Sequence, residues 1–258
     1  MLLAVDIGNT ETVVGLYDAE DTDLYDHWRI ATNDERTGDE HALLFGQFLA
    51  QRDLTFSDAT GLAVSSTVPR LRATMRRMAA RYIDVPTVIL EPGVKTGMPI
   101  LYENPKEVGP DRIANAVAAY DLYGGPTIVV DFGTATTFDA ITSKGEYAGG
   151  AIIPGVQISL DALFQRAAAV RRVDLGEPRH VIGKTTNESV QSGAVYGTAA
   201  LVEGLCERFE DELGESTVIS TGGLGGLFSR ITQRIEHHEP WLTLHGLRLI
   251  FEKNHPPA

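Results

Sequence analysis

The sequence contains a single cysteine, Cys206, in 258 residues, so no disulfide can form within the chain. Such a composition is typical of a reducing compartment. Cys206 lies on the apolar side of a predicted helix, which favours a small buried hydrophobe over a nucleophile. No apolar run approaches the ~20 residues of a membrane span, and the run before Asp6 is too short for a signal-peptide core. We therefore expect a soluble, cytoplasmic protein with no membrane association.

Basic residues are also scarce, because 22 Lys and Arg stand against 35 Asp and Glu, for a net charge of −13. A nucleic-acid-binding surface usually needs a basic face, so nucleic acid is disfavoured as a partner. The one dense basic group falls on a predicted helix and reads as its solvated face: Arg70, Arg72, Arg76, Arg77 and Arg81. With 43% hydrophobic and 22% charged residues, the composition is that of an ordinary globular protein. The length allows one large domain or two compact lobes.

The stretch from Ile128 to Asp139 organises the rest of the chain. Its apolar run stops at Asp131, and Gly133 then permits a tight reversal into a second strand. A carboxylate at a strand end, followed by glycine and hydroxyl residues such as Thr134, suits a triphosphate and its cation. The N–H groups and hydroxyls of the turn can donate to phosphate oxygens, and the acid can bind a metal or its water shell.

The same pattern occurs once more near the start of the chain. Val5-Asp-Ile-Gly-Asn-Thr-Glu-Thr12 aligns without a gap to Val130-Asp-Phe-Gly-Thr-Ala-Thr-Thr137, so that Val, Asp, Gly and the final Thr match. Both copies follow an apolar strand and precede a β-rich segment. A lone Asp-x-Gly is only a turn, but two aligned copies about half a chain apart predict a duplicated domain. We expect the copies to face each other across a phosphate-binding cleft.

Local patterns predict alternating strands and helices along the whole chain. The predicted strands are 2–6, 12–17, 25–31, 61–65, 86–90, 127–130, 137–141, 147–155 and 217–220. The predicted helices are 39–52, 68–82, 113–122, 156–169, 186–213 and 227–235, with a final strand and helix within 241–252. The order of the first half resembles one half of an actin-like nucleotide-binding protein.

Several segments outside these elements carry their own expectations. Residues 91–108 read as a long loop, which is usually functional or disordered. The turn Thr221-Gly-Gly-Leu-Gly-Gly226 suits a nucleotide's sugar or α-phosphate, although it is also simply a good turn. His237-His-Glu239 is expected to be a surface turn, and residues 254–258 a frayed tail. Gly193 and Gly197 lie one helical turn apart, which permits close packing within the chain or against a second subunit.

The corner Gly109-Pro-Asp-Arg112 leads from the long loop into a predicted helix. A kinase that acts on an alcohol needs a carboxylate beside the hydroxyl, to orient it and to accept its proton. Arg112 offers a cationic fork to a substrate that is a carboxylic acid. From these two residues alone, however, the simpler interpretation is structural: Asp111 is an acid at a helix start and Arg112 belongs to a surface salt bridge.

The chain resembles the type III pantothenate kinases, of the acetate kinase/sugar kinase/heat-shock-70/actin superfamily, nearly end to end. The motifs that carry the resemblance are Asp6-Ile-Gly-Asn-Thr10, Tyr102-Glu-Asn-Pro105, Gly109-Pro-Asp-Arg112, Asp131-Phe-Gly-Thr-Ala-Thr-Thr137, Gly149-Gly-Ala-Ile-Ile-Pro-Gly155, Gly183-Lys-Thr-Thr186, Thr221-Gly-Gly223 and Leu244-His-Gly-Leu247. The resemblance implies an α/β fold of two actin-like (ribonuclease H-like) lobes, each a mixed sheet flanked by helices. The lobes are expected at 1–115 and 116–258, with the final helix able to pack back on the first lobe.

This resemblance implies ATP-dependent phosphorylation of pantothenate to 4′-phosphopantothenate, the first step of coenzyme A synthesis, with Asp111 as catalytic base. It implies ATP and phosphate binding by Asp6, Ile7, Gly8, Asn9, Thr10, Glu11, Thr12, Val13, Gly133 and Thr134. It implies pantothenate binding by Tyr102, Gly109, Pro110, Asp111, Arg112 and Thr186. Pro110 stands where the family often has a small residue such as Ala. The proline stiffens the loop and does not remove a functional group.

The resemblance also implies the ions and the assembly. Asp6 is implied to lie near Mg²⁺, through water, and Asp131 to hold a monovalent cation, K⁺ or NH₄⁺. A homodimer with the pantothenate pocket at the subunit interface is implied as well. Two alternatives stay open: another small-molecule kinase, such as a sugar kinase, or a non-catalytic accessory factor. A sugar offers no carboxylate to Arg112, and an accessory factor would not need Asp6, Asp111 and Asp131 together.

Overall fold

The computed structural model describes residues 1–18, 23–167 and 171–256. The chain divides into two compact units, here called unit one (Met1–Ala118 with Leu242–Ala258) and unit two (Ala119–Trp241). Positions 168 and 169 of the helix predicted at 156–169, and 257 and 258 of the predicted tail, lie outside the described residues. Within the described part, no helix is both long enough and apolar enough to span a membrane.

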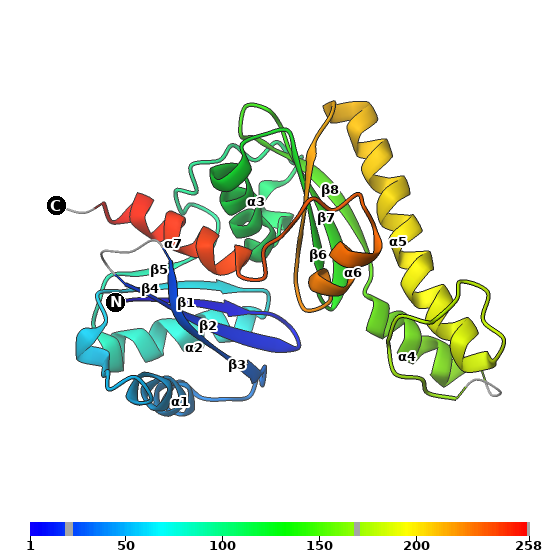
Figure 1. Cartoon of the computed structure of the whole chain (residues 1–258). Coiled ribbons are helices and arrows are strands. Elements are labelled where there is room, and N and C mark those ends of the chain that lie inside the picture. The colour runs from blue at the N-terminus through cyan, green and yellow to red at the C-terminus, as the bar shows by residue number, and fades with distance from the viewer. Residues whose placement is uncertain (19–22, 168–170, 257–258) are drawn as a thin grey trace. The chain divides into compact units, whose positions relative to one another are not determined.

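Unit one is built on a five-stranded sheet in the order β3-β2-β1-β4-β5. The strands are β1 (Leu2–Ile7), β2 (Glu11–Tyr17), β3 (Leu24–Ala31), β4 (Gly61–Ser66) and β5 (Thr87–Ile89). β1, β2 and β3 are antiparallel neighbours, whereas β4 and β5 run parallel to β1. Helices α1 (Gly38–Ala50) and α2 (Pro69–Met78) cover one face, and α7 (Leu242–Asn254) covers the other (Figure 1).

The core of unit one follows from the alternation of side chains along its strands. Val5 and Val64 point with their alternate neighbours into a buried apolar cluster beneath α1 and α2. On the opposite face a side chain at Gly61 would overlap the ring of Phe251, so the glycine lets α7 lie directly on the sheet. The Thr37 hydroxyl accepts from the Glu40 N–H in a capping box that starts α1.

Unit two repeats this architecture, with a sheet in the order β8-β7-β6-β9-β10. Its strands are β6 (Thr127–Phe132), β7 (Ala135–Ile141), β8 (Tyr147–Pro154), β9 (Thr217–Thr221) and β10 (His237–His238). Helices α4 (Val156–Arg166), α5 (Thr186–Leu213) and α6 (Gly225–Ile231) pack on it. The pairing senses match those of unit one strand for strand. The β2–β3 and β7–β8 ladders also carry a register shift at the equivalent place, after Leu16 and after Ala140. The predicted duplication is therefore confirmed.

Three local predictions are wrong. His237 and His238 form the edge strand β10, which pairs with β9, and not a surface turn. No strand precedes the final helix within 241–252, because α7 begins at Leu242. Asn254 is not frayed: its amide donates to the carbonyl of Lys95 at 2.9 Å and its Oδ1 lies 3.4 Å from the Lys95 N–H. This side chain fixes the long loop before the helix α3 (Pro110–Tyr123) to the end of α7.

Candidate active site

The first acid-tipped hairpin lies in unit one, between β1 and β2. Ile7 and Thr12 form its last strand pair, and the Gly8 N–H donates to the Glu11 carbonyl at 3.0 Å to close the turn. Asp6 stands just before the turn and is partly buried, whereas Asn9, Thr10 and Glu11 are exposed at its tip. The N–H of Thr32 donates to the Thr10 carbonyl at 2.9 Å, which holds the tip against the end of β3.

The second hairpin lies in unit two, between β6 and β7, and is one residue shorter. Its last strand pair is Phe132 with Thr136, and the Gly133 N–H donates to the Ala135 carbonyl at 3.1 Å. The equivalent of Thr12 is therefore Thr136 and not Thr137, which corrects the gapless alignment; Thr12 and Thr136 are both fully buried. Thr134 is exposed at the tip, as Asn9 is in the first hairpin.

The carboxylate of Asp131 is approached by the turn that follows β9. Gly222 has a φ of +82°, a conformation that side chains disfavour, and a Cβ there would overlap the Asp131 Oδ1 and the backbone of Phe132. A second glycine, Gly155, donates its N–H to the Thr134 carbonyl at 3.1 Å. Glycines thus bring bare backbone against both the acid and the tip of this hairpin.

Asp111 lies in the first turn of α3, in unit one. Its Oδ1 accepts from the N–H of Arg112 at 2.9 Å, and a Cβ at Gly109 would collide with the same oxygen. Burial raises the pKa of the Asp111 carboxyl above its ordinary range, against the opposing effects of the Arg112 amide and guanidinium. The Arg112 side chain is itself buried, at 7% exposure, so the predicted exposed surface salt bridge is excluded.

The remaining predicted residues divide between the two units. Unit one holds Tyr102, half-buried in the long loop, together with Pro110 at the first position of α3. Unit two holds Thr186, exposed at the start of α5, where the side chain of Thr185 caps the helix by accepting from the Glu188 N–H at 3.2 Å. Unit one therefore carries the first hairpin and the Asp111 corner, and unit two carries the second hairpin and Thr186.

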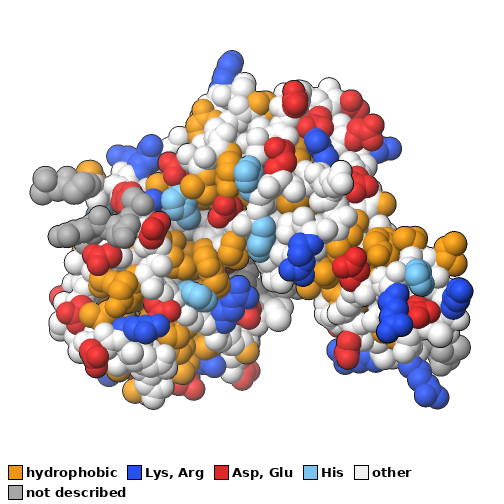
Figure 2. Space-filling model, viewed as in Figure 1, with side chains coloured by type: hydrophobic (Ala, Val, Ile, Leu, Met, Phe, Trp, Pro, Cys, Tyr) orange, Lys and Arg blue, Asp and Glu red, His pale blue; other side chains and the backbone are white. Residues whose placement is uncertain are grey.

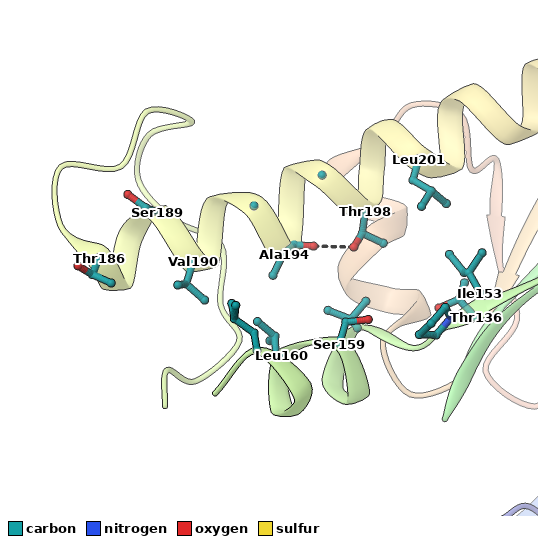
Figure 3. Close-up of a pocket in the computed structure, with 15 residues that line it drawn as sticks. Thr136, Ile153, Ser159, Leu160, Thr186, Ser189, Val190, Ala194, Thr198 and Leu201 are labelled. Atoms are coloured by element: carbon teal, nitrogen blue, oxygen red, sulfur yellow. Dashed lines mark hydrogen bonds between the residues drawn. The ribbon is translucent and has the colours of Figure 1, made fainter. Parts of the chain in front are cut away.

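An apolar groove of about 650 Å³ runs along α5 in unit two. Figure 3 shows Thr186, Val190, Ala194, Thr198 and Leu201 on α5 facing Ser159 and Leu160 of α4, with Thr136 and Ile153 from the strands at one end. Gly193 and Gly197 also line it, and nothing lies within 4 Å of where their Cβ atoms would be. The close packing predicted at these glycines is therefore not made by the residues that the structure describes.

The described residues contain no group of three or more His, Cys, Asp or Glu side chains that could hold a metal ion. A cation at Asp6 or Asp131 would take most of its ligands from phosphate oxygens and water, which is how Mg²⁺ is commonly bound. Cys206 is buried, and burial raises the pKa of its thiol to about 12, as expected for a small core residue and not for a nucleophile.

Each acid has a hydroxyl residue beside it on the adjacent parallel strand, and the sequence alone does not show that pairing. In the parallel pairing of β1 with β4, Asp6 lies opposite Ser65, and in that of β6 with β9, Asp131 lies opposite Thr221. Both hydroxyl residues are buried. Thr221 belongs to a glycine-rich turn that the sequence made visible, but Ser65 belongs to an apolar run with no local motif, so only the strand register identifies it.

Comparisons with known proteins identify the family and the fold. A family model described as type III pantothenate kinase matches residues 2–208. A protein of Streptomyces avermitilis named type III pantothenate kinase is 52% identical over 263 residues, which cover 98% of each chain. A candidate 2-dehydro-3-deoxygalactonokinase from Sinorhizobium meliloti superposes with a TM-score of 0.63 at 12% identity, covering 100% of this chain and 98% of that one. The activator of the 2-hydroxyisocaproyl-CoA dehydratase from Clostridium difficile, with bound ADPNP, gives 0.58 at 12% identity, with coverages of 98% and 94%. At such identity the structures establish the fold alone, two actin-like lobes as predicted.

Proposed function

This chain belongs to the type III pantothenate kinase family, and from that membership we propose that it transfers the γ-phosphoryl group of ATP to the primary hydroxyl of pantothenate. The product is 4′-phosphopantothenate, the first intermediate of coenzyme A synthesis. The observation that carries the assignment of chemistry is the Asp111 carboxyl, held in the first turn of α3 within the unit that contains the Asp6 hairpin.

Asp111 serves as the catalytic base. The Arg112 N–H fixes one oxygen of the carboxyl at 2.9 Å, and the carboxyl orients the pantothenate hydroxyl. Because burial raises the pKa of this carboxyl, it accepts a proton more readily than an exposed aspartate does. In a loose phosphoryl-transfer transition state the proton moves late, so the first task of the base is orientation. The buried Arg112 guanidinium provides the fork for the carboxylate of pantothenate.

The Asp6 hairpin binds the triphosphate and its magnesium. A single carboxylate at a strand end suits Mg²⁺, which keeps several waters and takes phosphate oxygens as ligands. Magnesium, when bound, neutralises charge that develops on the phosphoryl oxygens. The exposed backbone and side chains of Asn9 and Thr10 donate to the phosphates from the tip of the turn.

Asp131 holds a monovalent cation, K⁺ or NH₄⁺, at the second hairpin. The support for this assignment is the partly buried carboxylate at a strand end, with the bare backbone of Gly222 close against it. Turnover should rise with KCl or NH₄Cl over NaCl at equal ionic strength, and Asp131→Asn should lose that difference. Asp211→Asn, an exposed acid on α5, serves as the control and should retain it.

A second copy of this chain covers the groove on α5. Large apolar side chains stay exposed in this part of unit two: Ile152 62%, Ile158 46%, Leu163 41%, Val181 63%, Ile182 81% and Leu201 37%. Figure 2 shows hydrophobic side chains at the surface near the segment that leads into α5. Uncovered glycines at 193 and 197 let another helix approach closely, and Thr186 on the same groove would bring a pantothenate-binding residue to the interface.

The dimer has a direct test. Gly197→Arg should shift the mass measured by light scattering from dimer to monomer, and turnover should fall with it. Gly204→Arg, at a helical position further along α5 with only the Arg208 guanidinium near its Cβ position, is the control and should stay dimeric. A monomeric wild-type protein with full activity would contradict the proposal.

The activity itself is tested by supplying ATP, Mg²⁺, K⁺ and pantothenate and detecting 4′-phosphopantothenate by mass spectrometry. Asp111→Asn should retain ATP binding and lose ~10²–10⁴ in turnover, the usual contribution of a positioned base. Asp34→Asn, an exposed acid of unit one, should behave as wild type. A panel of sugars in place of pantothenate distinguishes the other small-molecule kinases, and a folded protein that phosphorylates none of these substrates would overturn the assignment.

A further inference from the structure

The end of β4 carries a polar side chain that the reaction described above does not use. Ser65 is fully buried, and its Oγ has no hydrogen-bond partner among the residues that the structure describes. A buried hydroxyl without a partner destabilises a fold relative to an alanine of similar shape. A partner supplied by a bound ligand would remove that cost.

The strand register places this hydroxyl beside Asp6. β1 and β4 are parallel, and Asp6 lies opposite Ser65 just as Val5 lies opposite Val64. Both valines belong to the core beneath α1 and α2. Because side chains alternate between the two faces of a strand, Asp6 and Ser65 both project from the other face, at the same end of their strands.

The surrounding turn is fixed by its own hydrogen bonds, which leave the Ser65 hydroxyl available. Thr67 donates to the Ile7 carbonyl through its N–H at 3.0 Å and through its hydroxyl at 3.2 Å. The Ser66 hydroxyl donates to the Val68 carbonyl at 2.9 Å and accepts from the Val68 N–H at 3.2 Å. The two neighbouring hydroxyls thus have structural roles, whereas that of Ser65 has none.

Unit two has the same arrangement, since Asp131 lies opposite the buried Thr221 in the parallel pairing of β6 with β9. An acid at a strand end with a hydroxyl residue on the adjacent parallel strand is therefore common to both halves of the duplicated fold. A feature shared by two diverged halves is better explained by what they both bind than by the packing of one strand.

Resting on the kinase function proposed above, we propose that Ser65 is a positioning residue for the magnesium-bound triphosphate at Asp6. Water bound to Mg²⁺ donates hydrogen bonds, and a serine hydroxyl can accept one while donating its own proton to a carboxylate oxygen. Both bonds together satisfy the buried hydroxyl and fix the orientation of the Asp6 carboxylate toward the hydrated cation.

The test is Ser65→Ala, with Ser66→Ala as the matched control. Ser65→Ala should leave the melting temperature of the ligand-free protein unchanged or raise it. It should raise about tenfold the Mg²⁺ concentration for half-maximal ATP binding in calorimetry, and leave ATP binding in EDTA unchanged. Ser66→Ala removes two structural hydrogen bonds, so it should lower the melting temperature and leave the Mg²⁺ midpoint where it is.

The opposite result, a lower melting temperature for Ser65→Ala with an unchanged Mg²⁺ midpoint, makes Ser65 a structural residue and overturns the proposal. If the alanine variant does not fold, Ser65→Cys keeps the volume with a much weaker hydrogen-bonding group and should give the same rise in midpoint. A wild-type protein that binds ATP without any effect of Mg²⁺ overturns the proposed function and this inference with it.

Discussion

Gly109→Ala changes the position of the Asp111 carboxylate, the proposed base, without removing it. A methyl group at residue 109 would lie about 1 Å closer to the Asp111 Oδ1 than the 3.4 Å at which ordinary contact begins. Among the described residues no other group lies so close to that methyl, so we expect the carboxylate to rotate away and lose its bond from the Arg112 N–H. Displacing a reacting group by ~1 Å can cost ~10²-fold in rate, and we expect kcat to fall by about that factor.

Steady-state kinetics measure kcat and the KM for ATP, and calorimetric titration measures the ATP affinity. Because the change acts through Asp111, the KM for ATP and the ATP affinity should stay within about twofold of wild type. The double variant Gly109→Ala with Asp111→Asn should be no slower than Asp111→Asn alone, since the carboxylate that the methyl displaces is already gone. Additive losses in the double variant would refute the idea that Gly109 acts by positioning Asp111.

Three further predictions concern stability. Burial raises the pKa of Asp111, so the folded protein holds this proton more tightly than the unfolded chain, and stability falls as the pH rises from the ordinary carboxyl range through the raised pKa. Asp111→Asn should therefore be more stable than wild type at pH 7 and not at pH 3, measured by urea unfolding. Burial lowers the pKa of His41 from 6.5 to about 4, so the unfolded chain takes up the proton first, and stability should fall by roughly 3 kcal/mol as the pH drops from 6.5 to 4. His41→Leu should abolish this loss in the same unfolding curves. A methyl at Gly246 would overlap the backbone carbonyl of Ala114, so Gly246→Ala should lower the unfolding free energy by about 2 kcal/mol or more. Gly204→Ala, which meets only an ordinary contact on α5, should instead raise the melting temperature slightly.

Local patterns predicted most elements because each has its own start, stop and period. The helix predicted at 186–213 is α5 (Thr186–Leu213), which begins behind the Thr185 cap and ends at Gly214 with a φ of +88°. The strands that end in Asp6 and Asp131 were equally clear, since each is an apolar run that stops at an acid and turns at a glycine. Caps, turns and periodicity of this kind depend only on residues that are close in the sequence.

Features that depend on distant partners were not predictable in this way. The alignment of the two hairpins was off by one residue because the matched letters do not encode how each turn closes. Gly8 bonds to a carbonyl three residues on, whereas Gly133 bonds to one two residues on. The strand β10 has only two residues, and it exists because β9 offers an unpaired edge that accepts the N–H of Glu236 at 2.9 Å and that of Glu239 at 2.8 Å. His237 and His238 alone carry no period that could show this.

The residues of the candidate site also divide into those that local motifs identify and those that only distant partners reveal. Asp6, Asp111 and Asp131 stand in motifs and could be named from the sequence, and so could the glycines that precede or follow them. Ser65 could not, because its relation to Asp6 exists only across the parallel ladder between β1 and β4. The raised pKa of Asp111 likewise depends on burial that a helix-start position does not reveal, since an exposed helix N-terminus would by itself favour the ionised form.

The duplication also explains where the two halves differ. Each half supplies a hairpin acid and a buried hydroxyl neighbour on the adjacent parallel strand. The helices that follow the last strand of each sheet are not equivalent in chemistry: α3 begins with Asp111 in its first turn, whereas the first turn of α7 has no acid. A base is needed only where the acceptor hydroxyl lies, so a symmetric pair of carboxylates at these helix starts would bury a second charge without a substrate to use it. An acid at the start of α3 and none at the start of α7 is therefore the difference expected between the two halves if Asp111 is the proposed base.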